Sequence, residues 1–244
     1  MHRADSLTHV DHLMAEASEA LVATRYARAE RVASDALTAA WMADGFGHMA
    51  RITLPLQEAR RQRTLQAFDT ARESGLGVRV LDFAIEEETE VFAGCWLVQP
   101  PFVGADARRL RAAALRQDRP VATVTREPLT RQGRCPIVAV GAVVARTTIE
   151  PPPTAVPDLV WFAAAIEALG DSIITAAAAE EDLRRRVEFL LQRLDALPEH
   201  EKLHQALADA CRLADRANRE GTLRKLAPES TRHDTFEVIA DEDP

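Results

Sequence analysis

The spacing of apolar residues changes twice along this chain of 244 residues, and the two changes limit the folds that it can adopt. Residues 5–74 carry apolar side chains at helical spacing and show no strand-like alternation. Residues 77–150 contain short runs of β-branched residues between turn signals, and helical spacing returns after residue 157. We therefore expect a mixed α+β or α/β protein in which helical segments flank a small α/β unit.

The first segment, residues 1–76, is predicted to form three helices. They cover about residues 6–23, 26–43 and 47–74. Pro55 should kink the third helix or mark a break in it, because proline lacks the N–H of the helical ladder. Three basic residues of this helix are expected on its solvated side: Arg60, Arg61 and Arg63.

The central segment, residues 77–150, is predicted to contain about four strands and one helix. The strands cover about residues 78–83, 94–98, 120–125 and 137–140, and the helix covers about 106–117. A strand, a helix and a strand in succession imply a right-handed crossover and a parallel pair. Residues 143–149 either extend the fourth strand or pair with it. One helix covers one face of such a sheet, so a flanking helix must cover the other.

The third segment, residues 151–226, begins with a stiff proline connector and then returns to helices. The predicted helices cover about residues 157–178, 180–196 and 200–220. The first of them is the best candidate to cover the second face of the sheet. Residues 227–244 form an acidic tail, which we expect to be loosely held.

Charge and cysteine content narrow the function classes. Acidic residues outnumber basic ones by 38 to 30, and the excess lies after residue 150, which argues against general affinity for nucleic acid. The 3 cysteines are odd in number and far apart, which fits a reducing compartment. The N-terminus lacks the apolar core of a signal peptide, and the longest apolar run, Ile137 to Ala145, is too short to cross a bilayer. These features predict a cytoplasmic protein without nucleic-acid or membrane partners.

Two segments resemble tetratricopeptide repeats, which are helix pairs with interlocking small and aromatic residues. The matching positions are Ala17, Tyr26, Ala29 and Ala36 near the N-terminus and Pro198, His204, Leu207, Ala208 and Cys211 near the C-terminus. Leu13 replaces the usual tryptophan of the repeat, and Glu16 stands where a leucine is expected. The stretch 50–63 also resembles a bacterial family without an assigned activity. The repeat resemblance implies helices that bind another protein.

A formal HExxH pattern, typical of zinc hydrolases, is formed by His200, Glu201 and His204. Lys202 puts a charge inside the pattern, Pro198 moves it to the first turn of a helix, and no convincing third ligand follows. We therefore interpret the pattern as a coincidence and expect no metal. On this interpretation the substitution His200→Ala should leave stability nearly unchanged.

Arginine is concentrated in residues 104–134, which carry eight arginines against three acidic residues. Ligands of open parallel sheets bind beyond the carboxyl ends of the strands, where two loops of this segment are expected. Arg126, Arg131 and Arg134 are candidates to hold a phosphate or carboxylate there. The alternative is a solvated helix face and a polar loop. No glycine-rich nucleotide motif is present, and Cys95 and Cys135 are expected to be buried thiols without a nucleophilic role.

Two functional hypotheses follow. The first is a non-catalytic interaction or scaffold protein, which has another protein as its partner and needs no cofactor. The second is a sensor or enzyme that binds a small anion through the arginine-bearing loops of the central unit. A pocket that holds Arg126, Arg131 and Arg134 together favours the second hypothesis, and an open apolar groove between helices favours the first.

Overall fold

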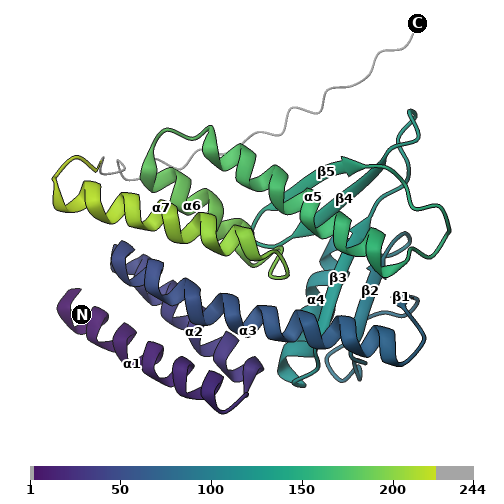
Figure 1. Cartoon of the computed structure of the whole chain (residues 1–244), viewed down its shortest axis with the longest axis horizontal. Coiled ribbons are helices and arrows are strands. Elements are labelled where there is room, and N and C mark those ends of the chain that lie inside the picture. Colours follow the sequence, from purple (N-terminus) through teal and green to yellow (C-terminus); the bar gives the residue numbers. More distant parts are fainter. Residues whose placement is uncertain (1–2, 224–244) are drawn as a thin grey trace, which may run out of the picture.

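The computed structural model describes residues 3–223, and the tail predicted for residues 227–244 lies outside them. Seven helices are present in the described part of the chain (Figure 1). Their bounds are α1 (Arg3–Val22), α2 (Tyr26–Met42), α3 (Phe46–Glu73), α4 (Gly104–Arg116), α5 (Leu159–Ala178), α6 (Leu183–Leu194) and α7 (Glu201–Arg219). The helical segments flank a central sheet, so the predicted α+β fold class is confirmed.

Five strands form one mixed sheet in the order β1-β2-β3-β4-β5. Their bounds are β1 (Val78–Val80), β2 (Gly94–Val98), β3 (Val121–Arg126), β4 (Cys135–Val140) and β5 (Val144–Ile149). The first three strands are parallel, and the last two continue as an antiparallel meander. The predicted parallel crossover is confirmed for β2, α4 and β3. The second alternative for residues 143–149 is correct, because β5 is a separate strand paired with β4.

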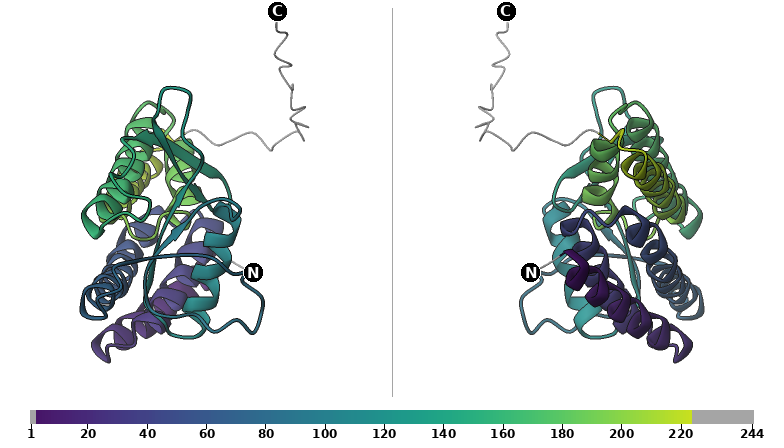
Figure 2. Two further views of the ribbon diagram at one scale, coloured as in Figure 1. Left: turned by 90° about the vertical axis from the view of Figure 1, so that its right-hand side faces the viewer. Right: turned by 90° about the vertical axis from the view of Figure 1, so that its left-hand side faces the viewer.

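Helices cover both faces of the sheet. Figure 2 shows α4 alone on one side and the longer helices on the other. The first face buries Trp96 and Val98 against Leu110 of α4. On the second face α3 packs on β2 and β3, whereas α5 packs on β3, β4 and β5. The prediction that the helix beginning near residue 157 covers this face is therefore correct for half of the sheet, and α3 covers the rest.

Residues from all three predicted segments share one buried core. Ile52 of α3, Leu97 of β2 and Leu207 of α7 belong to the same apolar cluster. Helix α7 packs along α3, so helices from the two ends of the chain lie side by side (Figure 1). Helix α3 runs without interruption past Pro55, and the alternative of a break there is wrong.

Helix α4 approaches the sheet closely because its first residue is a glycine. A Cβ atom at Gly104 would lie 2.4 Å from Cγ2 of Val140 on β4 and 3.8 Å from Cγ1 of Val138. Any larger residue would push the helix away from the strand. Val138 thus lies on the α4 face of the sheet, not on the face covered by α3 and α5.

In the described part of the chain, α5 is the one helix long and apolar enough to cross a membrane. It carries Glu167 and Asp171 on its exposed side together with Val160, and four other large apolar residues point into the core. These buried residues are Phe162, Ile166, Leu169 and Ile173. The same arrangement is typical of a core helix in a soluble protein.

Candidate functional site

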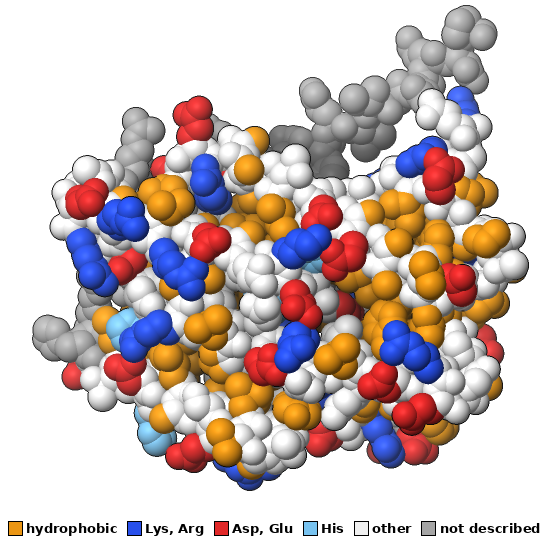
Figure 3. Space-filling view, viewed as in Figure 1, with side chains coloured by type: hydrophobic (Ala, Val, Ile, Leu, Met, Phe, Trp, Pro, Cys, Tyr) orange, Lys and Arg blue, Asp and Glu red, His pale blue; other side chains and the backbone are white. Residues whose placement is uncertain are grey.

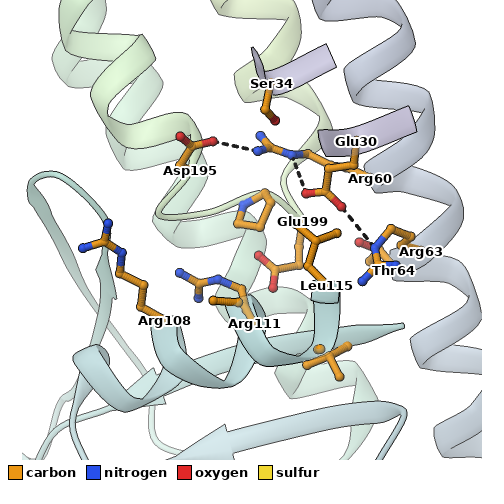
Figure 4. A pocket seen from close by; sticks show the side chains of 14 residues that line it. Glu30, Ser34, Arg60, Arg63, Thr64, Arg108, Arg111, Leu115, Asp195 and Glu199 are labelled. Carbon is orange, nitrogen blue, oxygen red and sulfur yellow. Dashed lines mark hydrogen bonds and ion pairs between the residues drawn. The ribbon is translucent and has the colours of Figure 1, made fainter. Parts of the chain in front are cut away.

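A polar cleft of about 270 Å³ lies where the three segments of the chain meet (Figure 4). One wall is formed by α2 and α3, the opposite wall by α4 and β3, and the third by the connection between α6 and α7. Its charged lining residues are Glu30, Arg60, Arg63, Arg108, Arg111, Asp195 and Glu199. Four guanidinium groups therefore face three carboxyl groups, a combination that fits an anionic ligand better than a cation.

Arg60 and Arg63 are buried against Glu30 of α2, which corrects the prediction of a solvated helix side. Their exposed fractions are 6% and 7%. Arg60 Nε lies 3.0 Å from Glu30 Oε1, and Arg63 Nε lies 3.1 Å from Glu30 Oε2. The residues are one turn apart on α3, so both reach the same carboxylate. Arg61 has its own partner, because it pairs with Glu58 near the surface at 2.9 Å.

The remaining donors of Arg60 and Arg63 tie α3 to the other two segments. Arg60 Nη2 lies 2.7 Å from Asp195 Oδ1, and Nη1 donates to the carbonyl of Leu194 at 3.3 Å. Arg63 Nη2 donates to the carbonyl of Arg119 at 2.8 Å. Burial opposes the charge of Arg60, but Asp195 and Glu30 together raise its pKa above the usual value. These two arginines are engaged in the framework of the cleft.

Arg108 and Arg111 have more donors to spare. They lie one turn apart on α4. Figure 4 shows both on the side of the cleft opposite Arg60 and Arg63. Arg111 donates to Thr123 Oγ1 at 2.8 Å and to the carbonyl of Val140 at 3.3 Å. Arg108 is exposed and makes one long hydrogen bond, 3.4 Å, to the carbonyl of Gly141. Since a guanidinium group has five N–H donors, both residues retain donors for a ligand.

Glu199 is buried at the bottom of the cleft, with an exposed fraction of 8%. Its Oε1 accepts a hydrogen bond of 3.0 Å from the N–H of Thr123 on β3. Among the described atoms its Oε2 has no hydrogen-bond partner. Burial raises the pKa of Glu199, although the charge of Arg111 and the N–H of Thr123 partly offset this. The sequence analysis missed this residue, because nothing in the pattern distinguishes a buried glutamate from one at a helix N-terminus.

The two histidines of the HExxH pattern face different partners. His200 caps α7, since its Nδ1 accepts the N–H of Leu203 at 3.2 Å. His204 Nδ1 lies 3.1 Å from the carbonyl of His200, and its Nε2 lies 3.4 Å from Arg60 Nη1. Both rings are buried, and Glu201 is exposed. The pattern therefore contributes a helix cap and a contact to Arg60, and His200 is structurally more important than the sequence indicated.

Outside the cleft, His200, Glu167 and Asp171 place possible metal-ligand atoms close together. His200 Nε2 lies 3.6 Å from Glu167 Oε2 and 3.5 Å from Asp171 Oδ1. The ammonium of Lys202 lies 2.8 Å and 3.2 Å from the same two oxygens and compensates their charge. Because Nδ1 of His200 accepts a hydrogen bond, the proton of the neutral ring is on Nε2. Nε2 then carries the proton, has no hydrogen-bond partner among the described atoms and offers no lone pair to a metal, which disfavours metal ligation.

The three arginines that the sequence analysis selected do not converge. Arg131 and Arg134 line one shallow hollow, whereas Arg126 lines another near the proline connector. Arg126 donates to Gln99 and to the carbonyl of Ala155, and Arg134 pairs with Glu150. In this arrangement Arg126 and Arg134 mainly hold neighbouring loops together. The arginines that do share a cleft come from α3 and α4.

A second, more open groove of about 660 Å³ lies between α1, α3 and α7. Figure 3 shows basic side chains at this end of the molecule, on the left of the view, mixed with acidic ones. Those that line the groove are Arg51, Arg212, Arg216 and Arg219. The lining is mixed, since Leu7 and Leu54 are its largest apolar residues and Asp44 and Asp215 lie beside the arginines.

All three cysteines are free and buried, and burial was predicted for Cys95 and Cys135. Burial raises the pKa of Cys95 and of Cys211 to about 12. Their thiols therefore stay protonated near neutral pH and are poor nucleophiles. Cys135 is shifted in the same direction by burial.

Comparisons with protein-family models, with curated protein sequences and with solved structures found no significant match. The function of the chain is therefore inferred from the chemistry of its own residues.

Proposed function

We propose that this protein binds a small anionic molecule, with a carboxylate or phosphate group, in the cleft between α3 and α4. The observation that supports this most is the pair Arg108 and Arg111, which line the cleft with donors left over. The cleft is close in size to the smaller ligand pockets of proteins. The proposal keeps the small-anion hypothesis of the sequence analysis but assigns it to Arg108 and Arg111 instead of Arg126, Arg131 and Arg134.

The framework around the cleft supports an anion rather than a cation. Glu30 and Asp195 already pair with Arg60 and Arg63, so their negative charges are compensated. Arg108 has no carboxylate partner among the described residues. Arg111 has no ion pair there either, although the charges of Glu199 and Asp195 act on it against those of Arg60 and Arg108. A carboxylate or phosphate between Arg108 and Arg111 would receive charge-assisted hydrogen bonds from both.

Binding is tested by thermal melts and calorimetric titration with inorganic phosphate, n-propyl phosphate and succinate, against sodium chloride of equal ionic strength. We expect saturable stabilisation that is lost in Arg108→Gln. This exposed residue has few contacts, so its substitution should not unfold the protein. The matched control is Arg109→Gln on the same helix, since Arg109 does not line the cleft. No stabilisation of the wild type, or equal stabilisation of both variants, would overturn the proposal.

The interaction-protein hypothesis remains a second candidate, and the groove between α1, α3 and α7 supports it. Arg51, Arg212 and Arg219 already pair with Asp11, Asp209 and Asp215, so Arg216 is the groove arginine that would contact an acidic side chain of a partner. The variant Arg216→Glu should then lose a partner that the wild type captures. The tetratricopeptide likeness, the cytoplasmic location and the absence of nucleic-acid and membrane partners stay predictions.

A further inference from the structure

Glu199 occupies a place where the sheet leaves a backbone donor without a strand partner. The ladder between β3 and β4 consists of the pairs Thr125–Val138 and Arg126–Ile137. Thr123 lies before this ladder, and its N–H is taken by Glu199 Oε1. Thr123 also holds Glu199 through its hydroxyl at 3.5 Å, while Arg111 donates to that same hydroxyl. The carboxyl group is thus fixed in position from the strand side.

The other oxygen of Glu199 is the unusual feature. A buried carboxylate oxygen without a donor is unfavourable, because it has lost its water and gained nothing in return. Glu199 Oε2 is in this condition among the described atoms, and Glu199 lines the cleft. In Figure 4 the carboxyl group projects between Arg111 and the residues of the opposite wall. A ligand in the cleft is well placed to supply the missing donor.

We propose that the ligand is a small acid that also carries a hydroxyl or amino group, and that Glu199 Oε2 accepts a hydrogen bond from that group. This inference rests on the proposed anion site, since Arg108 and Arg111 would hold the acidic end of the same molecule. A simple anion offers Oε2 no donor and would place a second negative charge near Glu199. A hydroxy acid or amino acid satisfies the guanidinium groups and the carboxylate together.

The test uses pairs of probes that share the acidic group and differ in the donor: succinate with malate, propionate with lactate, and n-propyl phosphate with glycerol 3-phosphate. Dissociation constants are measured by calorimetric titration at constant pH and ionic strength. For the wild type we expect the donor-bearing acid of a pair to bind about tenfold more tightly, as expected for one charge-assisted hydrogen bond. Equal affinities within every pair would overturn the inference.

Two variants assign the preference to Glu199. Glu199→Gln conserves size and keeps an oxygen for the N–H of Thr123, but it removes the negative charge and turns an amide donor towards the cleft. A ligand hydroxyl can still accept from that amide, so the preference should lose its charge-assisted part and fall well below the wild-type value. Glu201→Gln is the matched control, because Glu201 is exposed and does not line the cleft; it should keep the preference. A preference that keeps its full wild-type size in Glu199→Gln would overturn the inference.

The outcomes also separate the two proposals. If all acids bind with similar affinity and Arg108→Gln abolishes binding, the anion site stands and the role of Glu199 is wrong. If no acid binds the wild type, both proposals fail.

Discussion

Arg60 on α3 and Asp195 at the end of α6 are 135 positions apart in the chain, yet Nη2 of the arginine lies 2.7 Å from Oδ1 of the aspartate. The same guanidinium group contacts Glu30 of α2 and His204 of α7. One buried side chain thereby joins the N-terminal helices to the C-terminal ones at the edge of the cleft. The integrity of this network should decide both stability and the shape of the site.

Glu30→Gln should lower the free energy of unfolding by about 3–5 kcal/mol, because Arg60 and Arg63 lose the carboxylate that they share while staying buried. The measurement is urea denaturation at neutral pH. Glu58→Gln is the control, since Glu58 pairs with Arg61 near the surface and should contribute less than about 1 kcal/mol. Similar losses of unfolding free energy in the two variants would show that the buried ion pairs of Glu30 stabilise the protein no more than the surface pair of Glu58.

Ala29→Leu should destabilise the protein by about 1–3 kcal/mol, because the added atoms have no space. Ala29 is fully buried and packs with Ala20 of α1 and Ala59 of α3. Ala15→Leu on the exposed side of α1 is the comparison and should change the denaturation midpoint little. An unchanged midpoint for Ala29→Leu would contradict close packing of these three helices.

His204 should make the protein sensitive to acid. Burial, with a contribution from the charge of Arg60, lowers its pKa to about 3, against about 6.5 in the unfolded chain. Between these values the unfolded state binds a proton that the folded state does not, so stability falls as pH falls below about 6.5. The maximum slope for one such group is about 1.4 kcal/mol per pH unit.

His204→Gln should flatten this decline, as measured by urea denaturation from pH 7 to pH 5. The variant His9→Gln, at an exposed position of α1, should retain the slope of the wild type. A slope that is the same in all three proteins would rule out His204 as a source of the acid sensitivity.

His200→Ala should destabilise the protein by at least about 1 kcal/mol, because α7 loses its cap and a buried ring is removed. Gly170→Ala should also be destabilising, since a Cβ atom there would lie 2.2 Å from the ring of His200. Both effects are measured by thermal melts with and without zinc. Stoichiometric zinc in the purified protein, lost in His200→Ala, would restore the metal interpretation of the HExxH pattern.

A fragment of residues 77–150 should be unfolded or aggregated, and the full chain should melt in one transition. Without α3 and α5, the sheet would expose Leu97 and Val124, which are buried in the complete protein. The measurements are calorimetry of the full chain and amide resonances of the fragment. Dispersed resonances from a soluble fragment would identify the central segment as an independent domain.

The local pattern was sufficient to predict the elements. Helical spacing placed all the described helices, and β-branched runs between turn signals placed the strands, because both signals arise from neighbouring residues along the chain. The mixed fold class followed from the order of these elements. At Pro55 the local rule left a kink and a break open, and α3 continues through the proline without a break.

The site depended on information that the pattern does not contain. Eight arginines in residues 104–134 drew attention to Arg126, Arg131 and Arg134, but composition does not say which guanidinium groups meet. Arg60 and Arg63 looked solvated beside Glu58, and only the positions of α2 and of the connection after α6 made them buried. Glu199 likewise is recognised as a cleft residue only in the tertiary structure, where it accepts the N–H of Thr123 from β3.

The sequence by itself thus determined which stretches are helices and strands, because spacing along the chain decides which side of each element is apolar. Only the tertiary structure decided which charged residues are buried together. The free energy of a buried charge depends on partners brought from distant segments, and Glu30, Arg60 and Asp195 acquire theirs when α2, α3 and α6 meet.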